Sequence, residues 1–261
     1  MKKLVCMLAF AALCAGTAFA GPTPGSGVLN SPHDINTLAG LQKDLQGRVC
    51  AFCHTPHHAV DLGGEYNPLW SHQPFTGAGI PYESATFDAD NNGAIDPLIG
   101  PSRLCMSCHD GAIAPDQHYG ATHLGTLPVS GIYASDDFGG IAVGLGGYFG
   151  NDHPIGFDVA ESATDVGIFA DTFSGRTWKL GGVDGASAVA ISAGLYDASG
   201  VGSGPFYFTC ATCHDVHNQD NVENSAANGQ GDAAHLDEIN GNYFVFAPQS
   251  GSQLCLSCHD K

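Results

Sequence analysis

The stretch Cys50-Ala51-Phe52-Cys53-His54 decides how this chain is to be read, because its pattern Cys-x-x-Cys-His occurs three more times. The second, third and fourth motifs contain Cys105, Cys108 and His109; Cys210, Cys213 and His214; and Cys255, Cys258 and His259. This spacing is the attachment signature of c-type haem: the two thiols add to the haem vinyl groups, and the following histidine becomes the proximal iron ligand. The sequence therefore predicts four covalently bound haem c groups, each held by one motif.

Three other uses of paired cysteines fit less well. Four disulfides are conceivable in an exported chain, but a histidine after every second cysteine would then be a coincidence. A zinc ribbon has its two cysteine pairs about fifteen to twenty residues apart, whereas the closest pairs here are separated by more than forty residues. A thioredoxin-like redox site needs one such pair near a βαβ pattern, and the sequence has none that we recognise.

The four motifs form an internal repeat of two different halves. The first and third motifs share Cys-Ala-x-Cys-His-x-x-His, ending at His57 and His217, and the second and fourth share Ser-x-Leu-Cys-x-Ser-Cys-His-Asp, ending at Asp110 and Asp260. The order is the same in each half, so we predict two dihaem modules, 21–130 and 131–261. Their boundary should lie in the glycine-rich stretch near residues 125 to 150.

The repeat also sorts the remaining histidines. Nine histidines lie outside the four proximal positions: His33, His57, His58, His72, His118, His123, His153, His217 and His235. Only two pairs recur. His57 and His217 each lie three residues past a proximal histidine, and His33 and His153 each lie upstream of the two motifs of their half. We predict that these four are distal iron ligands, with His57 and His217 reaching neighbouring haems. The other five histidines are not repeated, and we expect them mostly at the surface or beside a haem rather than bound to iron.

The N-terminus has the features of an export signal. Lys2 and Lys3 precede an apolar run, and Ala18-Phe19-Ala20 provides a small-x-small cleavage site, so residues 1–20 are predicted to be a signal peptide. A lipoprotein interpretation of Cys14 is weaker, because Leu13 stands where a small residue is expected. No later stretch is long enough to span a membrane. The mature chain is expected to be secreted and to reach the cell outer surface, with the periplasm as the alternative.

Charge and composition limit the partners and the fold. Loss of Lys2 and Lys3 lowers the formal net charge from −18 to about −20, which argues against nucleic acid and anionic lipid as partners. Glycine contributes 36 residues and charged residues only 13%, a composition typical of a loop-rich chain. We predict mostly coil with few short helices and strands, the chain being wrapped around a stacked haem array. Short strands are expected within 166–169 and 206–208, and single helical turns near the motifs.

A calcium loop is a further candidate. Residues 88–96 follow the first nine places of such a loop, with candidate calcium ligands at Asp88, Asp90, Asn92 and Asp96 and a glycine at Gly93. Ile99 stands where the bidentate acid of position twelve would be. An Asp/Asn-Gly turn on an acidic surface therefore remains the alternative.

The motifs carry a family resemblance. Cys-x-x-Cys-His-Thr-Pro-His at residues 50–57, Pro68-Leu69-Trp70 and Ser-x-Leu-Cys-x-Ser-Cys-His-Asp-Gly at residues 102–111 are similar to the paired-CXXCH multihaem cytochromes of metal-respiring bacteria. With four haem motifs, the chain resembles their filament-forming outer-surface tetrahaem cytochromes (OmcE type). The resemblance implies a polymer with haems stacked along its axis, two histidines on every iron, and one histidine crossing to the next subunit. By this resemblance, His57 is the histidine expected to bind a haem in the next subunit.

Three functions follow from these observations. The first is a subunit of an extracellular conducting filament, built from copies of the chain, that passes electrons from redox protein donors to external acceptors such as metal oxides. The alternative is a monomeric periplasmic electron shuttle. A multihaem reductase is less favoured, because an enzyme needs an open iron position and nearby acid or base groups, whereas histidines here are numerous enough to close every site. We therefore expect no catalytic residues.

Overall fold

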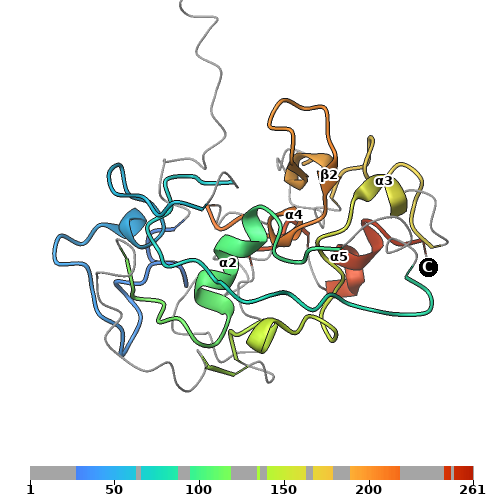
Figure 1. Cartoon of the computed structure of the whole chain (residues 1–261). Coiled ribbons are helices and arrows are strands. Elements are labelled where there is room, and N and C mark those ends of the chain that lie inside the picture. The colour runs from blue at the N-terminus through green and yellow to red at the C-terminus, as the bar shows by residue number, and fades with distance from the viewer. Residues whose placement is uncertain are drawn as a thin grey trace, which may run out of the picture.

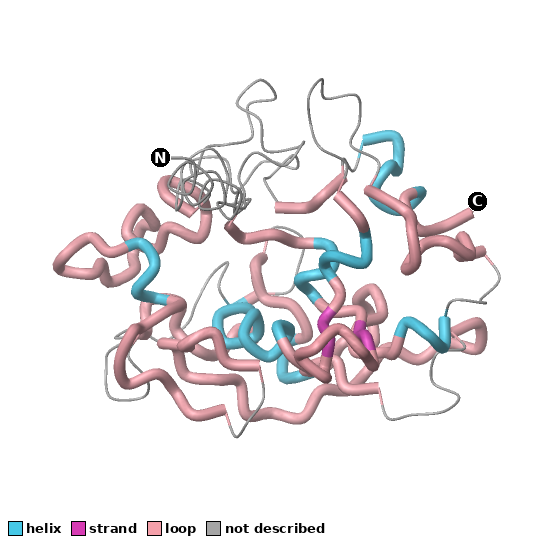
Figure 2. Tube along the Cα trace, turned by 90° about the horizontal axis from the view of Figure 1, so that it is seen from above, coloured by secondary structure: helices cyan, strands magenta, loops and turns pink. Residues whose placement is uncertain are grey.

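The computed structural model describes residues 28–62, 66–87, 95–118, 134–135, 140–162, 167–178, 189–217, 244–247 and 250–260. Loops and turns make up most of this part of the chain, and Figures 1 and 2 show short helices separated by long irregular segments. The elements are η1 (Val49–Phe52), α2 (Pro101–His109), η4 (Leu145–Gly147), α3 (Val159–Ser162), η5 (Ile191–Gly194), β1 (Tyr196–Asp197), β2 (Phe206–Tyr207), α4 (Cys210–Cys213), η9 (Ser250–Ser252) and α5 (Gln253–Leu256). The predicted boundary between residues 130 and 131 lies outside the described residues.

A helical turn is present at each of the four motifs. η1, α4 and α5 are turns of four residues, whereas α2 has nine. α2 is longer than the single turn expected, and it begins at Pro101, where the fixed φ of proline suits the first helical position. In α4, Thr209 and Thr212 form a capping box, and the Thr209 amide donates to Thr212 Oγ1 at 2.9 Å.

The residues that follow these turns are anchored to distant segments. At the first, third and fourth motifs the carbonyl of the second cysteine accepts a backbone hydrogen bond: Ser71 to Cys53 at 2.9 Å, Phe246 to Cys213 at 3.1 Å, and Phe169 to Cys258 at 3.0 Å. The histidine itself sits in a single antiparallel bridge, opposite Trp70, Val245 and Ile168 respectively. At the second motif, the Val143 amide donates to the carbonyl of His109 at 2.7 Å. Each motif histidine therefore has its backbone fixed from elsewhere in the chain.

The only strands among the described residues form one short antiparallel pair. Tyr196 lies opposite Tyr207 and Asp197 opposite Phe206, which confirms the strand expected within 206–208. Asp197 closes the connecting loop, because its carboxylate accepts hydrogen bonds from Ser199 N at 3.0 Å and Gly204 N at 3.1 Å. In the other expected region, Ile168 makes only its bridge to His259, and Val166 is outside the described residues.

Among the described residues, apolar side chains gather in four separate clusters. One contains Phe75, Leu98, Met106 and Phe149; a second contains Phe157, Val159 and Phe208; a third contains Ile35, Leu38 and Phe52; and a fourth contains Trp178, Ile191 and Ala247. Cys213 packs against the second and fourth clusters, and Cys258 against the fourth. Partly buried apolar residues extend each cluster, most of all the second and the fourth.

Within the part of the chain that the structure describes, every helix is too short or too polar to cross a membrane.

Candidate functional site

The four motifs lie in a row that follows the order of the chain. Figure 1 shows η1 in blue at one side, α2 at the centre, α4 beside it and α5 beyond. The first and second motifs are linked where Trp70 Nε1 donates to Ser107 Oγ at 3.2 Å. Trp70 is the residue whose backbone bridges His54. The segment that supports the first histidine therefore also rests on the second motif.

The second and third motifs meet across the predicted halves. The backbone amide of Cys210 donates to Ser102 Oγ at 3.1 Å. The Cys105 and Cys210 thiols also form a hydrogen bond, which raises the pKa of Cys105 and lowers that of Cys210. The third and fourth motifs are connected through the cluster around Trp178 and Ile191, against which Cys213 and Cys258 both pack. Each motif thus contacts, or shares a cluster with, the next motif along the chain.

Most of the motif thiols are neutral at pH 7. Burial raises the pKa of Cys53 to about 11, that of Cys213 to about 12 and that of Cys258 to about 11, and it also raises the pKa of Cys108. The thiolate is the form that binds zinc or acts as a nucleophile. A buried thiol of this kind is a weak nucleophile, which does not favour a redox-active cysteine pair.

Two motif histidines have a ring nitrogen oriented for metal binding. The Nδ1 atom of His54 lies 2.7 Å from the carbonyl oxygen of Pro68, and that of His109 lies 2.6 Å from the carbonyl oxygen of Ile141. Because a carbonyl can only accept, Nδ1–H is the donor in both rings. The proton of a neutral imidazole is then on Nδ1, so Nε2 carries the lone pair that a metal needs. A hydrogen bond of this kind orients and fixes metal-binding histidines in general.

Three of the four motif histidines face a second histidine from the predicted distal set. The pairs, with the distance between ring centroids, are His54 with His217 at 6.1 Å, His33 with His109 at 6.1 Å, and His153 with His259 at 6.3 Å. A histidine nitrogen lies about 2.0 Å from a bound metal ion such as zinc, and the ring centroid lies about 1.1 Å behind that nitrogen. Two imidazoles on opposite sides of one metal ion therefore have centroids about 6.2 Å apart. The centroid distances of the three pairs are those expected when both rings bind one metal ion.

An unpartnered buried atom supports this fit. His33 Nδ1 is buried and has no hydrogen-bond partner among the described residues, an arrangement that costs free energy in a complete structure. The His33 ring lies between His109, at 6.1 Å, and Phe244, at 4.8 Å. Burial, together with the nearby His109, His214 and His217, lowers the pKa of His33 to about 3. His33 is therefore the neutral imidazole that metal binding requires.

The remaining predicted ligands, His57 and His214, are placed differently. Both are exposed, and His214 is close enough to His33 to affect the pKa of His33. The loop to His57 is held by Thr55, whose hydroxyl accepts from the His57 amide at 3.4 Å. In the third motif Asp215 takes the same role, since its Oδ1 accepts from the His217 amide at 3.1 Å. His57 and His217 are thus held alike relative to their own motifs.

His72 is a buried histidine next to the second motif that the sequence analysis did not single out. It was grouped with histidines expected mostly at the surface or beside a haem, but its side chain is fully buried, and Nε2 lies 3.6 Å from Cys108 Sγ. Nε2 is also 3.1 Å from the Ala114 carbonyl oxygen, and burial lowers the pKa of His72. Its sequence signal is the nearby Trp70, which is buried together with Ser71 and His72.

The other unrepeated histidines fall in three situations. His118 lies 3.7 Å from Asp44 and 4.8 Å from the ring of Phe52, so it belongs to a polar network near the first motif. His58 is exposed. His123 and His235 lie outside the described residues.

The predicted calcium loop is mostly outside the described residues, since only Asp96 among its candidate ligands is described. Asp96 Oδ1 accepts from the Leu98 amide at 3.0 Å, as in an Asx turn. The described residues contain no group of three or more His, Cys, Asp or Glu side chains arranged for a metal ion. Calcium binding stays a prediction.

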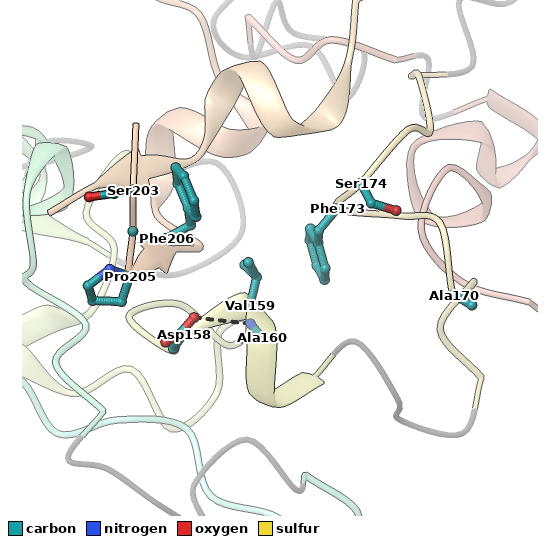
Figure 3. Close-up of a pocket in the computed structure, with 10 residues that line it drawn as sticks. Asp158, Val159, Ala160, Ala170, Phe173, Ser174, Ser203, Pro205 and Phe206 are labelled. Atoms are coloured by element: carbon teal, nitrogen blue, oxygen red, sulfur yellow. Dashed lines mark hydrogen bonds between the residues drawn. The ribbon is translucent and has the colours of Figure 1, made fainter. Parts of the chain in front are cut away.

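A separate cavity of about 360 Å³ lies between α3 and the loop that leads into β2 (Figure 3). Phe206 and Phe173 stand on opposite sides, with Val159 between them, and Asp158 caps α3 by accepting from the Ala160 amide at 3.0 Å. Phe173 also packs in the cluster that contains Cys213 and Cys258. The cavity has an apolar wall and no histidine, so it is not one of the paired-histidine sites.

No model of a known protein family matches the chain. No curated protein matches it either.

Proposed function

We propose that this protein carries electrons through four covalently bound haem c groups as the subunit of an extracellular filament. The observation that carries the proposal is the combination of four Cys-x-x-Cys-His motifs with three histidine pairs whose rings are 6.1 to 6.3 Å apart. Neither a disulfide framework nor a zinc ribbon accounts for histidines that face the motif histidines at this distance.

The residues have distinct roles in this proposal. The paired cysteines hold the haem covalently, and His54, His109, His214 and His259 provide the proximal nitrogens. When bound, haem supplies a one-electron couple at its iron. The facing rings of His33, His153 and His217 would provide a second histidine to three of the irons, which would leave no open iron position for a small substrate there. Hydrogen bonds from Nδ1 of His54 and His109 to backbone carbonyls hold these rings in one orientation.

The order of the motifs supports a single row of haem sites. Neighbouring motifs in the chain are neighbours in space, and the most exposed motif cysteines are Cys50 and Cys255. These belong to the first and fourth motifs, at the two ends of the row. Electrons would therefore enter or leave near these ends, next to a redox protein donor, an external acceptor such as a metal oxide, or another copy of the chain.

The filament rests on the family resemblance and on the position of His57. His217, the equivalent of His57, faces a motif histidine in the other half of the chain at 6.1 Å. His57 is held in the same way and is exposed like His217, but among the described residues its ring faces no motif histidine. We infer that His57 reaches a haem site in the next subunit, so that polymerisation completes the ligand set. A periplasmic shuttle with the same haems would leave His57 without this role.

Intact mass spectrometry and negative-stain microscopy of the purified protein test the proposal in two steps. Four haem masses added covalently to the chain are expected, and any other number contradicts the haem assignment. Filaments of uniform width are expected in the images. Monodisperse particles with four haems would support the shuttle, whereas strong carbon monoxide binding by the reduced wild-type protein would point to an open iron and to the reductase.

A further inference from the structure

His217 and His54 come from different halves of the chain, yet their rings face each other. The centroids are 6.1 Å apart and the ring planes are nearly parallel, at 23°. In the other two pairs both histidines belong to the same half, and the planes are inclined at 62° and 68°. The pair therefore differs from the others in both origin and orientation.

Each ring is positioned by its own local structure. His54 has its backbone in a bridge with Trp70, its ring edge against the Trp70 indole at 6.1 Å, and Nδ1 donating to Pro68. On the opposite side, His217 is held by Asp215, which accepts from its amide and lies 3.8 Å from its Nδ1. In both residues an acceptor lies on the Nδ1 side, which leaves Nε2 for a metal.

We propose that His217 is the distal ligand of the iron bound at His54, so that one iron joins the second half of the chain to the first. This inference rests on the proposed haem binding and adds which histidine serves the first motif. The two halves also contact each other between the second and third motifs, where the Cys210 amide donates to Ser102 Oγ. Two halves related by sequence repeat are thus held together by a metal bond as well as by side-chain packing.

The inference predicts a spectroscopic difference among the haems. In low-spin ferric haem, nearly parallel axial imidazoles give a rhombic electron paramagnetic resonance signal, whereas strongly inclined imidazoles give a highly anisotropic one. His217→Ala should remove a rhombic signal and make one haem in four high-spin, while the anisotropic signals of the pairs with inclined planes persist. Added imidazole should restore the low-spin state. His58→Asn is the matched control, since His58 is exposed and has a positive φ that asparagine tolerates.

A second variant identifies the haem. In a background with Cys50→Ser and Cys53→Ser, the first haem is absent and the other three remain. Adding His217→Ala to this background should then produce no new high-spin iron. A new high-spin haem in that background would overturn the inference, because His217 would then be the ligand of another motif's iron. A His217→Ala protein that keeps four low-spin haems would overturn it as well. Failure of the proposed function can be told apart from failure of this inference, because mass spectrometry of the wild-type protein would then not show four covalent haems.

Discussion

The pairs His33–His109 and His153–His259 occupy equivalent places in the two halves but differ in their surroundings. Their rings are separated by similar distances and inclined at similar angles. His33, however, is half-buried, with its Nδ1 enclosed and Phe244 4.8 Å away, whereas His153 is exposed and packs 5.5 Å from Phe208. The second motif has neighbours on both sides and the fourth on one. A repeated pair of ligands can therefore be interior in one half and peripheral in the other.

The largest effect is expected from His33→Ala. The substitution removes a ring that fills the space between His109 and Phe244, and a cavity of this kind costs about 2 to 4 kcal/mol of unfolding free energy. One haem in four should also become high-spin. Thermal unfolding followed by absorbance, together with carbon monoxide binding, measures both effects. A variant with unchanged spin state would remove His33 from the ligand set.

His153→Ala should give the same spin change with a smaller loss of stability. Because His153 is exposed, its removal should cost no more than about 1 kcal/mol. Carbon monoxide should reach the vacated position faster than in His33→Ala, which flash photolysis can measure. Equal stability losses and equal rates in the two variants would show that the difference in burial has no consequence.

Gly156→Ala tests how the exposed histidine is positioned. Gly156 has φ of +84°, its amide donates to the Phe208 carbonyl at 2.7 Å, and a Cβ atom there would collide with the backbone of Asp96 and Pro97. We expect a loss of about 1 to 3 kcal/mol from backbone strain and overpacking. The signal of the His153–His259 pair should change while that of His33–His109 does not. Gly175→Ala is the control, because nothing lies within 4 Å of a Cβ there.

Another effect of about 1 kcal/mol concerns acid stability in the first half. The Arg48 guanidinium donates to the buried Asp44 carboxylate at 2.6 Å and holds the pKa of Asp44 below its usual range. Asp44 therefore contributes stability that is fully present above the unfolded-state pKa of about 3.9 and is lost as pH falls toward the lower folded-state value. Asp44→Asn should cost about 1 kcal/mol at neutral pH and flatten the acid branch of the unfolding curve. If the acid branch of the variant is as steep as in the wild type, carboxyl groups other than Asp44 cause the loss of stability in acid.

Local patterns account for what could be predicted from sequence. Cys-x-x-Cys-His places two thiols and a ring on one helical turn, so the pattern itself indicates the chemistry, and a turn is indeed present at every motif. The recurrence of His33 with His153 and of His57 with His217 selected the candidate ligands without any coordinates. Phe206–Tyr207 was identifiable as a strand from its aromatic, β-prone composition. The stacked haem array remains a prediction.

Contacts between residues far apart in the sequence account for the rest. The partner of each motif histidine could not be predicted, because His217 and His54 are separated by more than 160 residues and no local period links them. Burial of His72 likewise depends on the contact with Cys108. By itself, the sequence determined the four motifs, the repeat and the set of candidate ligands, since these are properties of spacing within a few residues. Only the tertiary structure decided which rings face each other and which pair is enclosed, because loop-rich chains bring such residues together through long-range packing.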